Sequence, residues 1–327
     1  MAVASLVLTS LYLAKLRGKA RRRLSAGQLE EDQAGHASTR HFDDGFHPAG
    51  CPAPPTVLPP PTVRSERLVH GGRRELVVIA EALEPELAHA AFDFSATHSG
   101  PWGTYLQLDA LHADGSFELS PSAASLDEPR IAELALQIVR SLLEREAGEI
   151  LRPDLDRVHG FGVWSVMGGV GRMTEYHMDY AEMYRRKTGI LRPPLHGITL
   201  QLSPVSADEI EGGTFGAHVG GLRHYAKYGY KCRLAPFEGD TPTPDWGCDA
   251  GWRFAPFAFN QATVCAGDLP HAASRIMRWP NHTPRIVIGI NTFTHVEGPT
   301  EALLPQHSAA FRRAMKLQKL EAVSYTH

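Results

Sequence analysis

The chain has 327 residues, of which 43% are hydrophobic and 21% are charged, as in ordinary globular proteins. Its formal net charge of −3 at pH 7 gives no general attraction to nucleic acid or to an anionic membrane surface, so a nucleic-acid partner is not expected. Cys51, Cys232, Cys248 and Cys265 form no Cys-x-x-Cys pair, which disfavours a structural zinc site and favours free thiols, with a Cys232–Cys248 disulfide as the alternative in an oxidising compartment.

Residues 1–66 are predicted to be a leader and a linker outside the folded domain. Residues 1–14 are apolar, basic residues gather at 15–23, and the first acid is Glu30. The apolar stretch is shorter than the roughly 20 residues of a transmembrane helix, so no firm membrane span is predicted. An arginine-rich leader without acids favours targeting to a mitochondrion or plastid; secretory or endoplasmic-reticulum targeting and an untargeted disordered tail are the alternatives. Proline-rich residues 45–62 are typical of an extended linker.

The folded domain is expected over residues 67–300, and its first part combines strands with supporting helices. A buried strand is predicted at 75–80, followed by a helix at 83–94. Residues 101–120 hold two strand-like runs around an Asp-Gly dipeptide, which is a turn signal.

A second helix is predicted at 127–147, where apolar residues recur at helical spacing. Asp127 is expected to cap its first turn and Gly148 to end it. Its amphipathic pattern indicates a supporting helix packed against a sheet.

After this helix the pattern becomes rich in strands, and the predicted fold class is mainly β with supporting helices (α+β), built as an antiparallel double sheet. No glycine-rich phosphate loop or nucleophile elbow is present, which disfavours kinases, dehydrogenases and α/β-hydrolases. A long insertion is expected at about 217–252, and residues 301–327 are expected to form a C-terminal helix. Strands are predicted at 160–167, 174–180, 196–203, 211–215, 261–266 and 284–293.

Three His-x-Asp tripeptides begin at His41, His112 and His177. On a strand, residues two apart point to the same face, so His177 and Asp179 can supply an imidazole and a carboxylate to one non-haem iron ion, with a distant histidine as the third ligand. The tripeptide at His41 precedes the proline-rich linker and has no scaffold. The tripeptide at His112 lies on the predicted Asp-Gly turn, where the two side chains need not share a face.

Five motifs follow one another in an informative order. They are the strand before the metal pair, Tyr176–Asp179, Glu211–Phe215, Ala266–Ser274 and Arg285–Phe293, and they span residues 75–296. This order resembles the 2-oxoglutarate and Fe(II)-dependent dioxygenases, especially their prolyl 4-hydroxylase-like branch. The resemblance implies a double-stranded β-helix (jelly-roll, cupin-like) core in which His177, Asp179 and His271 bind Fe(II) and leave three positions open.

In this family, 2-oxoglutarate takes two of the open positions and O₂ takes the third, and an anchor residue binds the far carboxylate. Arg285 suits that role because arginine forms a bidentate fork with a carboxylate. Its period-2 companions on the strand would share its face, and Ile286, Ile288 and Ile290 would point the other way. Arg275 is a competing anchor, because the gap from His271 to Arg285 is longer than is usual in this branch. Strand phase makes Thr199 and Gln201 candidate cosubstrate-binding residues, and Trp164, Tyr176 and Thr214 further lining candidates.

The resemblance implies oxidative decarboxylation of 2-oxoglutarate to succinate and CO₂, coupled to hydroxylation of a C–H bond. The expected substrate is a prolyl or other residue in a peptide or protein, with O₂ consumed and ascorbate as an accessory. A free amino acid or small metabolite is the alternative substrate, and a catalytically silent jelly-roll binding module is the alternative function.

Two residues limit the resemblance, and the oligomeric state is left open. Arginine at position 285 differs from the lysine of collagen-type prolyl hydroxylases, and Asp179 disfavours a halogenase-like centre. The insertion, where basic and aromatic residues alternate, is either a surface for a peptide or single-stranded nucleic acid, or a solvated loop. These residues are Arg223, His224, Tyr225, Lys227, Tyr228, Tyr230, Lys231 and Arg233.

Overall fold

The computed structural model describes residues 68–70, 73–188, 190–228 and 251–314. The chain divides into two compact units, residues 1–51 and 52–327, and every described residue belongs to the second. The predicted leader and linker, the centre of the insertion and the end of the C-terminal helix therefore lie outside the described residues. Within these ranges, no helix is long and apolar enough to cross a membrane.

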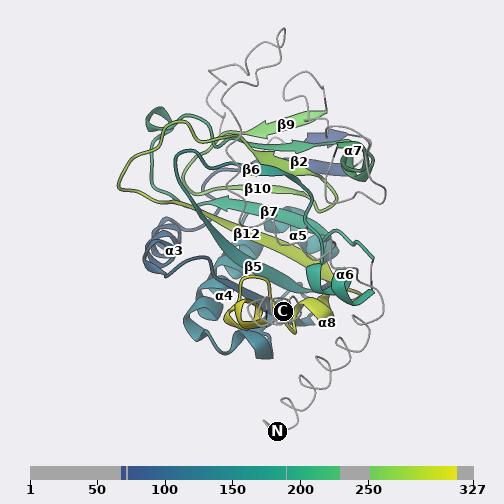
Figure 1. Cartoon of the computed structure of the whole chain (residues 1–327). Helices are drawn as coiled ribbons and strands as arrows, with labels where there is room; N and C mark the ends of the chain where they lie inside the picture. The colour runs from purple at the N-terminus through teal and green to yellow at the C-terminus, as the bar shows by residue number, and fades with distance from the viewer. Residues whose placement is uncertain (1–67, 71–72, 189, 229–250, 315–327) are drawn as a thin grey trace, which may run out of the picture. The chain divides into compact units, whose positions relative to one another are not determined.

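Two antiparallel sheets form the described domain, with supporting helices, which confirms the predicted fold class (Figure 1). The larger sheet has the strand order β1-β2-β10-β7-β12-β5-β3-β4, and the smaller has the order β6-β11-β8-β9. The strands of the larger sheet are β1 (Leu68–His70), β2 (Arg73–Ile79), β3 (Gly103–Leu111), β4 (Phe117–Pro121), β5 (Val158–Gly168), β7 (His196–Gln201), β10 (Gln261–Ala266) and β12 (Arg285–Thr294). Those of the smaller sheet are β6 (Thr174–His177), β8 (Phe215–His218), β9 (Trp252–Ala255) and β11 (His271–Ala273).

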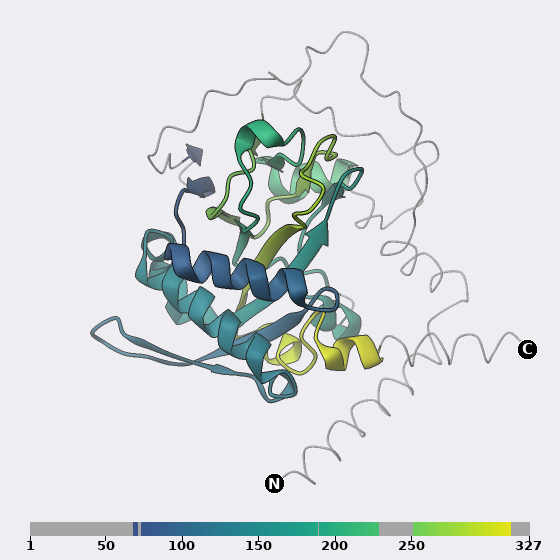
Figure 2. The same ribbon diagram turned by 90° about the vertical axis from the view of Figure 1, so that its left-hand side faces the viewer.

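Two helices, α3 (Pro85–Thr97) and α4 (Pro129–Glu144), cover one face of the larger sheet (Figure 2). Alternate residues of β7 and β12, including Ile198, Leu200 and Ile288, pack in the core between these helices and the sheet. A strand turns successive side chains to opposite faces, so this core leaves the intervening residues of β7 and β12 for the interior between the two sheets. That interior is where the predicted site residues of these strands lie.

The expected caps of the second helix are wrong. Helix α4 begins at Pro129 with Glu128 as N-cap, and Asp127 instead accepts a hydrogen bond from Arg313 Nη2 at 2.8 Å. Gly148 does not end α4 but begins the short helix α5 (Gly148–Leu151). A side chain at Gly148 would collide with the Leu143 carbonyl, so glycine is needed where the two helices approach each other.

The insertion predicted at about 217–252 falls in the connection between β8 and β9. Strand β8 extends to His218, helix α7 (Gly221–Tyr228) follows it, and β9 begins at Trp252. The predicted strand start at 211–215 is a turn: Gly212 and Gly213 have φ angles of 81° and 71°, and β8 begins only at Phe215. Near the C-terminus, the described chain forms the short helix α8 (Gly298–Glu301) and is helical again at 309–314.

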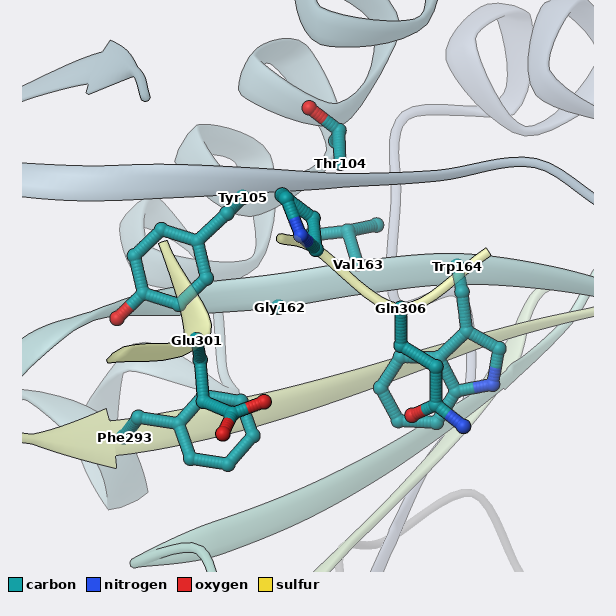
Figure 3. A pocket seen from close by; sticks show the side chains of 9 residues that line it. Thr104, Tyr105, Gly162, Val163, Trp164, Phe293, Glu301 and Gln306 are labelled. Atoms are coloured by element: carbon teal, nitrogen blue, oxygen red, sulfur yellow. The ribbon is translucent and has the colours of Figure 1, made fainter. Parts of the chain in front are cut away.

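Helix α8 also carries a buried acid, Glu301, which Figure 3 shows near Tyr105 and Phe293. Glu301 lies in a small pocket beside Tyr105 and Phe293, and its Oε1 atom accepts a hydrogen bond from Tyr184 N at 2.8 Å. Tyr184 belongs to helix α6 (Glu182–Thr188), which begins three residues after Asp179. Burial raises the pKa of Glu301 to about 7, and the nearby acids act in the same direction.

We expect Glu301→Gln to stabilise the protein above neutral pH. Between pH 4.5 and 7 the folded chain binds a proton at Glu301 that the unfolded chain has released, so the stability from this site falls as pH rises through that window. Glutamine keeps an oxygen for Tyr184 N and carries no charge. The free energy of unfolding should rise by about 1–3 kcal/mol at pH 8 and hardly change at pH 5, as measured by urea denaturation.

The matched control is Glu182→Gln, which removes the partner of Arg185 and Arg186 on helix α6 and should not stabilise the protein at pH 8. An equal effect of Glu301→Gln at both pH values would contradict the assignment of a buried, titrating carboxyl.

Candidate metal centre

The pairing of β6 with β11 brings the two predicted histidine ligands together. His177 is the last residue of β6 and His271 is the first of β11, and the two are direct partners in the antiparallel ladder. Their ring centroids lie 4.3 Å apart with an angle of 62° between the rings. Residues 94 positions apart in the sequence thus present two imidazoles to the same space.

Asp179 lies beside both histidines, although not on the strand where it was expected. Strand β6 ends at His177, where its ladder with β11 also ends. Asp179 therefore lies in the following loop, with Oδ1 3.5 Å from His177 Nε2 and Oδ2 3.9 Å from His271 Nε2. One ligand atom from each of the three residues lies within 4.8 Å of the others.

Two of the three candidate ligands, His271 and Asp179, are oriented by a further contact. His271 Nδ1 lies 3.1 Å from the Leu269 carbonyl, so a proton donated from Nδ1 leaves the Nε2 lone pair directed at Asp179. Asn291 Nδ2 donates to Asp179 Oδ2 at 3.2 Å. The tripeptide at His112, by contrast, is exposed, and His112 contacts Glu118.

The electrostatics of the cluster favour the protonation states that a metal requires. Burial and the neighbouring His177 lower the pKa of His271 to about 4, so its imidazole is neutral at pH 7. Burial alone would raise the pKa of Asp179, but its contacts with His177, His271 and Asn291 hold that pKa well below its usual range. Two imidazoles and one carboxylate form the donor set that suits non-haem Fe(II).

Arg285 is a buried cation in the same interior. It is the first residue of β12, only 8% exposed, and its Nε atom has no hydrogen-bond partner among the residues that the structure describes. Its guanidinium carbon lies 5.9 Å from the centroid of the Phe257 ring, and Gly213 leaves space beside Nε. Burial lowers the pKa of Arg285 to about 10, so the side chain remains charged at pH 7. A buried charge is costly unless an anion accompanies it.

Gln201 adds a second unpartnered donor. The side chain is fully buried, and Oε1 accepts a hydrogen bond from Ala258 N at 3.0 Å. Within the described chain, its Nε2 atom has no partner. Gln201 pairs with Val287 on β12, two residues from Arg285, and Thr199 pairs with Gly289, so both predicted residues lie on the strand next to Arg285.

Two of the other lining candidates have different surroundings. Tyr176 points away from the metal pair: its hydroxyl contacts His224 Nδ1 at 2.6 Å, and its ring packs on Tyr225 and Trp252. Trp164 fills the space above Gly289, where any side chain would overlap its ring. Tyr176 is therefore a packing residue, because adjacent residues of a strand face opposite ways.

The remaining candidates are Thr214 and Arg275. Thr214 is partly buried, and its backbone N–H donates to Ser274 Oγ at 3.0 Å. Arg275 is partly buried, whereas Arg285 is enclosed, and the Arg275 carbonyl occupies the space next to Gly212. The buried guanidinium, whose Nε atom has no hydrogen-bond partner in the described part of the chain, favours Arg285 as the anchor.

The described start of the predicted basic, aromatic segment is packed against the smaller sheet. Tyr225 is fully buried with Tyr176 and Trp252, and the His224 ring stacks on His218 with centroids 3.4 Å apart. Tyr225 therefore belongs to a core cluster and is not part of a solvated binding surface, whereas His224 is partly buried. The residues from Tyr230 to Arg233 lie outside the described ranges.

Sequence reasoning missed two neighbours of Asp179. Asn291 was placed on the face of Arg285 but was given no contact with the carboxylate. The sequence predicts Cys265 only as a free thiol. In the structure its Sγ atom is buried, 3.5 Å from the Gly197 carbonyl. Burial, together with the nearby Asp179 carboxylate, raises the pKa of the Cys265 thiol to about 12. Strand phase alone was the available signal for both.

Several solved structures are similar to this chain. A Pseudomonas putida prolyl-4-hydroxylase is 11% identical over 67% of this chain and 92% of its own, with a TM-score of 0.33. A Trichoplax adhaerens prolyl hydroxylase, in complex with a hypoxia inducible factor peptide fragment, is 12% identical over 68% of this chain and 86% of its own, with a TM-score of 0.35. HygX from Streptomyces hygroscopicus, with nickel and 2-oxoglutarate bound, is 12% identical over 66% and 81%, with a TM-score of 0.36.

No protein-family model and no curated protein matches the chain. The structural likenesses are too distant in geometry to carry a functional assignment, which depends on the side chains of the site.

We expect His177→Ala and His271→Ala each to weaken binding of Fe(II), or of Mn(II) as its redox-stable substitute, by more than about 100-fold, because each removes one of three ligands. Anaerobic metal titration followed by calorimetry measures the change. The matched control is His112→Ala, which alters a His-x-Asp tripeptide away from the cluster and should bind metal as tightly as the parent. Equal weakening in all three variants would contradict the proposed ligand set.

Proposed function

We propose that this protein is an Fe(II)- and 2-oxoglutarate-dependent oxygenase that hydroxylates a C–H bond. The observation that carries the proposal is the combination of His177, Asp179 and His271 with Arg285, a buried cation whose Nε atom has no hydrogen-bond partner among the described residues. A metal centre alone would suit several chemistries. The additional buried cation points to an anionic cosubstrate next to the metal.

The residues of the site would have separate roles in binding the metal and the cosubstrate. His177, Asp179 and His271 would hold the metal. Arg285 binds the far carboxylate of 2-oxoglutarate, and Gln201 Nε2 and Thr199 offer further hydrogen bonds. When bound, Fe(II) and 2-oxoglutarate supply the oxidising chemistry that the side chains lack.

Apolar residues complete this interior and exclude water from it. The Phe215 ring lies 5.4 Å from that of His271, and Phe215 packs with Leu76 and Leu269 in one buried cluster. A dry, enclosed site strengthens the charge–charge contact between Arg285 and a carboxylate.

We expect Arg285→Met to raise KM for 2-oxoglutarate by roughly 30- to 1,000-fold, because loss of a buried charged partner costs about 2–4 kcal/mol. Metal affinity should stay within a few-fold of the parent. Succinate release, assayed with Fe(II), O₂ and ascorbate as the proposed accessory, measures the effect.

Arg275→Met is the matched control and should leave KM for 2-oxoglutarate unchanged. The opposite pattern, with the loss in Arg275→Met only, would transfer the anchor role to Arg275. A parent protein that binds Fe(II) but never consumes 2-oxoglutarate, across peptide and amino-acid panels, would support the silent binding module instead.

For the substrate, we propose a prolyl or other residue within a peptide. Exposed apolar side chains gather around the connection from β5 to β6, and backbone bonds from Gly171 to Ile276 and from Ile276 to Arg172 join this connection to the segment after β11. A peptide can contact such a surface through the residues that flank the reacting one. A free amino acid has no flanking residues and cannot make these contacts. We call this surface the apolar rim, and it consists of Val166, Met167, Val170, Met173 and Met277.

The double variant Val170→Ser/Met173→Ser should raise KM for a peptide substrate by about tenfold and leave peptide-independent succinate release unchanged. Leu126→Ser, an equally exposed apolar site outside the rim, is the control. Turnover of free amino acids that is insensitive to both changes would favour the small-metabolite alternative.

A further inference from the structure

Asn291 links the larger sheet to the metal-binding carboxylate. It lies on β12, on the same face as Arg285, and is only 3% exposed. Its Nδ2 atom donates to Asp179 Oδ2 at 3.2 Å, across 112 positions of sequence. Only the amide nitrogen can donate to a carboxylate, so the contact sets the orientation of the amide.

Asp179 depends on such a contact more than the histidines do. His177 and His271 stand on paired strands, and His271 is also fixed by the Leu269 carbonyl. Asp179 follows the end of β6 in a loop, and its other close polar contacts are with the two ligand histidines themselves. Asn291 therefore fixes Asp179 to the central strand β12 through a hydrogen bond that does not involve another candidate ligand.

Burying the polar side chain of Asn291 costs folding free energy unless its contacts at the site compensate for it. Its Oδ1 atom is buried and has no hydrogen-bond partner in the described part of the chain. Asn291 pairs with Gly197 on β7, and a side chain at 197 would meet Asn291 Oδ1 and Cys265 Sγ, each at 3.5 Å. These are ordinary contact distances, so the cost at this position comes from the buried, unsatisfied Oδ1 atom, which an apolar side chain at 291 would not carry.

We propose that Asn291 is a positioning residue that engages Asp179 Oδ2 and so reserves Oδ1 as the single carboxylate donor to the metal. A carboxylate that binds through one oxygen occupies one metal position and leaves three open, whereas a carboxylate that binds through both oxygens leaves fewer. The inference rests on the proposed metal centre and deepens it, because it assigns a residue that controls how many positions stay open to cosubstrate and O₂.

The test compares metal binding and apo stability in Asn291→Leu and Asn291→Ala with those of the parent. Both variants remove the donor; leucine fills the space and alanine leaves it empty. We expect Mn(II) affinity to fall 10- to 100-fold in both, and the Mn(II) electron paramagnetic resonance spectrum to change. The thermal midpoint of the metal-free Asn291→Leu protein should stay at or above that of the parent, because no buried polar atom remains at 291.

The control is Asn260→Gly. Asn260 is also a buried asparagine, but its amide bonds only to the backbone of Leu83, and its φ of 57° suits glycine. This variant should lose thermal stability and keep the parent's Mn(II) affinity. Parent protein that fails to bind Mn(II) would overturn the metal centre itself. Parent protein that binds, together with Asn291 variants of equal affinity and unchanged spectrum, would overturn the role of Asn291 alone.

Discussion

The ladder contact between β6 and β11 is the constraint on which the site depends. It places His177 opposite His271 and thereby fixes the spacing of two imidazoles that are remote in sequence. Asp179 lies just beyond the end of this ladder, in the loop that follows β6. Because Asp179 lies in a loop, whereas His177 and His271 lie on strands, its position depends on a separate contact. The hydrogen bond from Asn291 provides that contact.

Strand β12 organises the opposite side of this interior. Its isoleucines at 286, 288 and 290 pack beneath α3 and α4, and this burial fixes the register of the strand. Arg285 and Asn291 lie on the opposite face of β12 from these isoleucines. Gly289, on that same face, makes room for Trp164. A one-residue slip would turn the arginine and the asparagine into the apolar core, so core packing and site geometry are determined together.

Much of this arrangement could be predicted from the sequence because strong local patterns carried it. The alternation in β7 and β12, the helical repeat of α4 and the Asp-Gly turn are signals within a few residues. Choosing His177 over His112 needed only the context of each tripeptide. Combining His271 with His177 needed more, namely the resemblance in motif order, since no local signal joins residues 94 positions apart.

Other features depended on tertiary contacts that leave no local trace. Gly148 has the sequence signature of a helix end but serves the approach of α5 to Leu143. Tyr176 shares a motif with the metal ligands yet points into the cluster beneath α7. The bond from Asn291 to Asp179 became visible only once the loop position of Asp179 was known.

The most direct test of the account is anomalous diffraction from crystals soaked with Mn(II), recorded at the manganese absorption edge. The account predicts one strong peak between His177 Nε2, Asp179 Oδ1 and His271 Nε2, with Asp179 Oδ2 still bonded to Asn291. A manganese peak elsewhere, or coordination that excludes any of the three ligands, would contradict it.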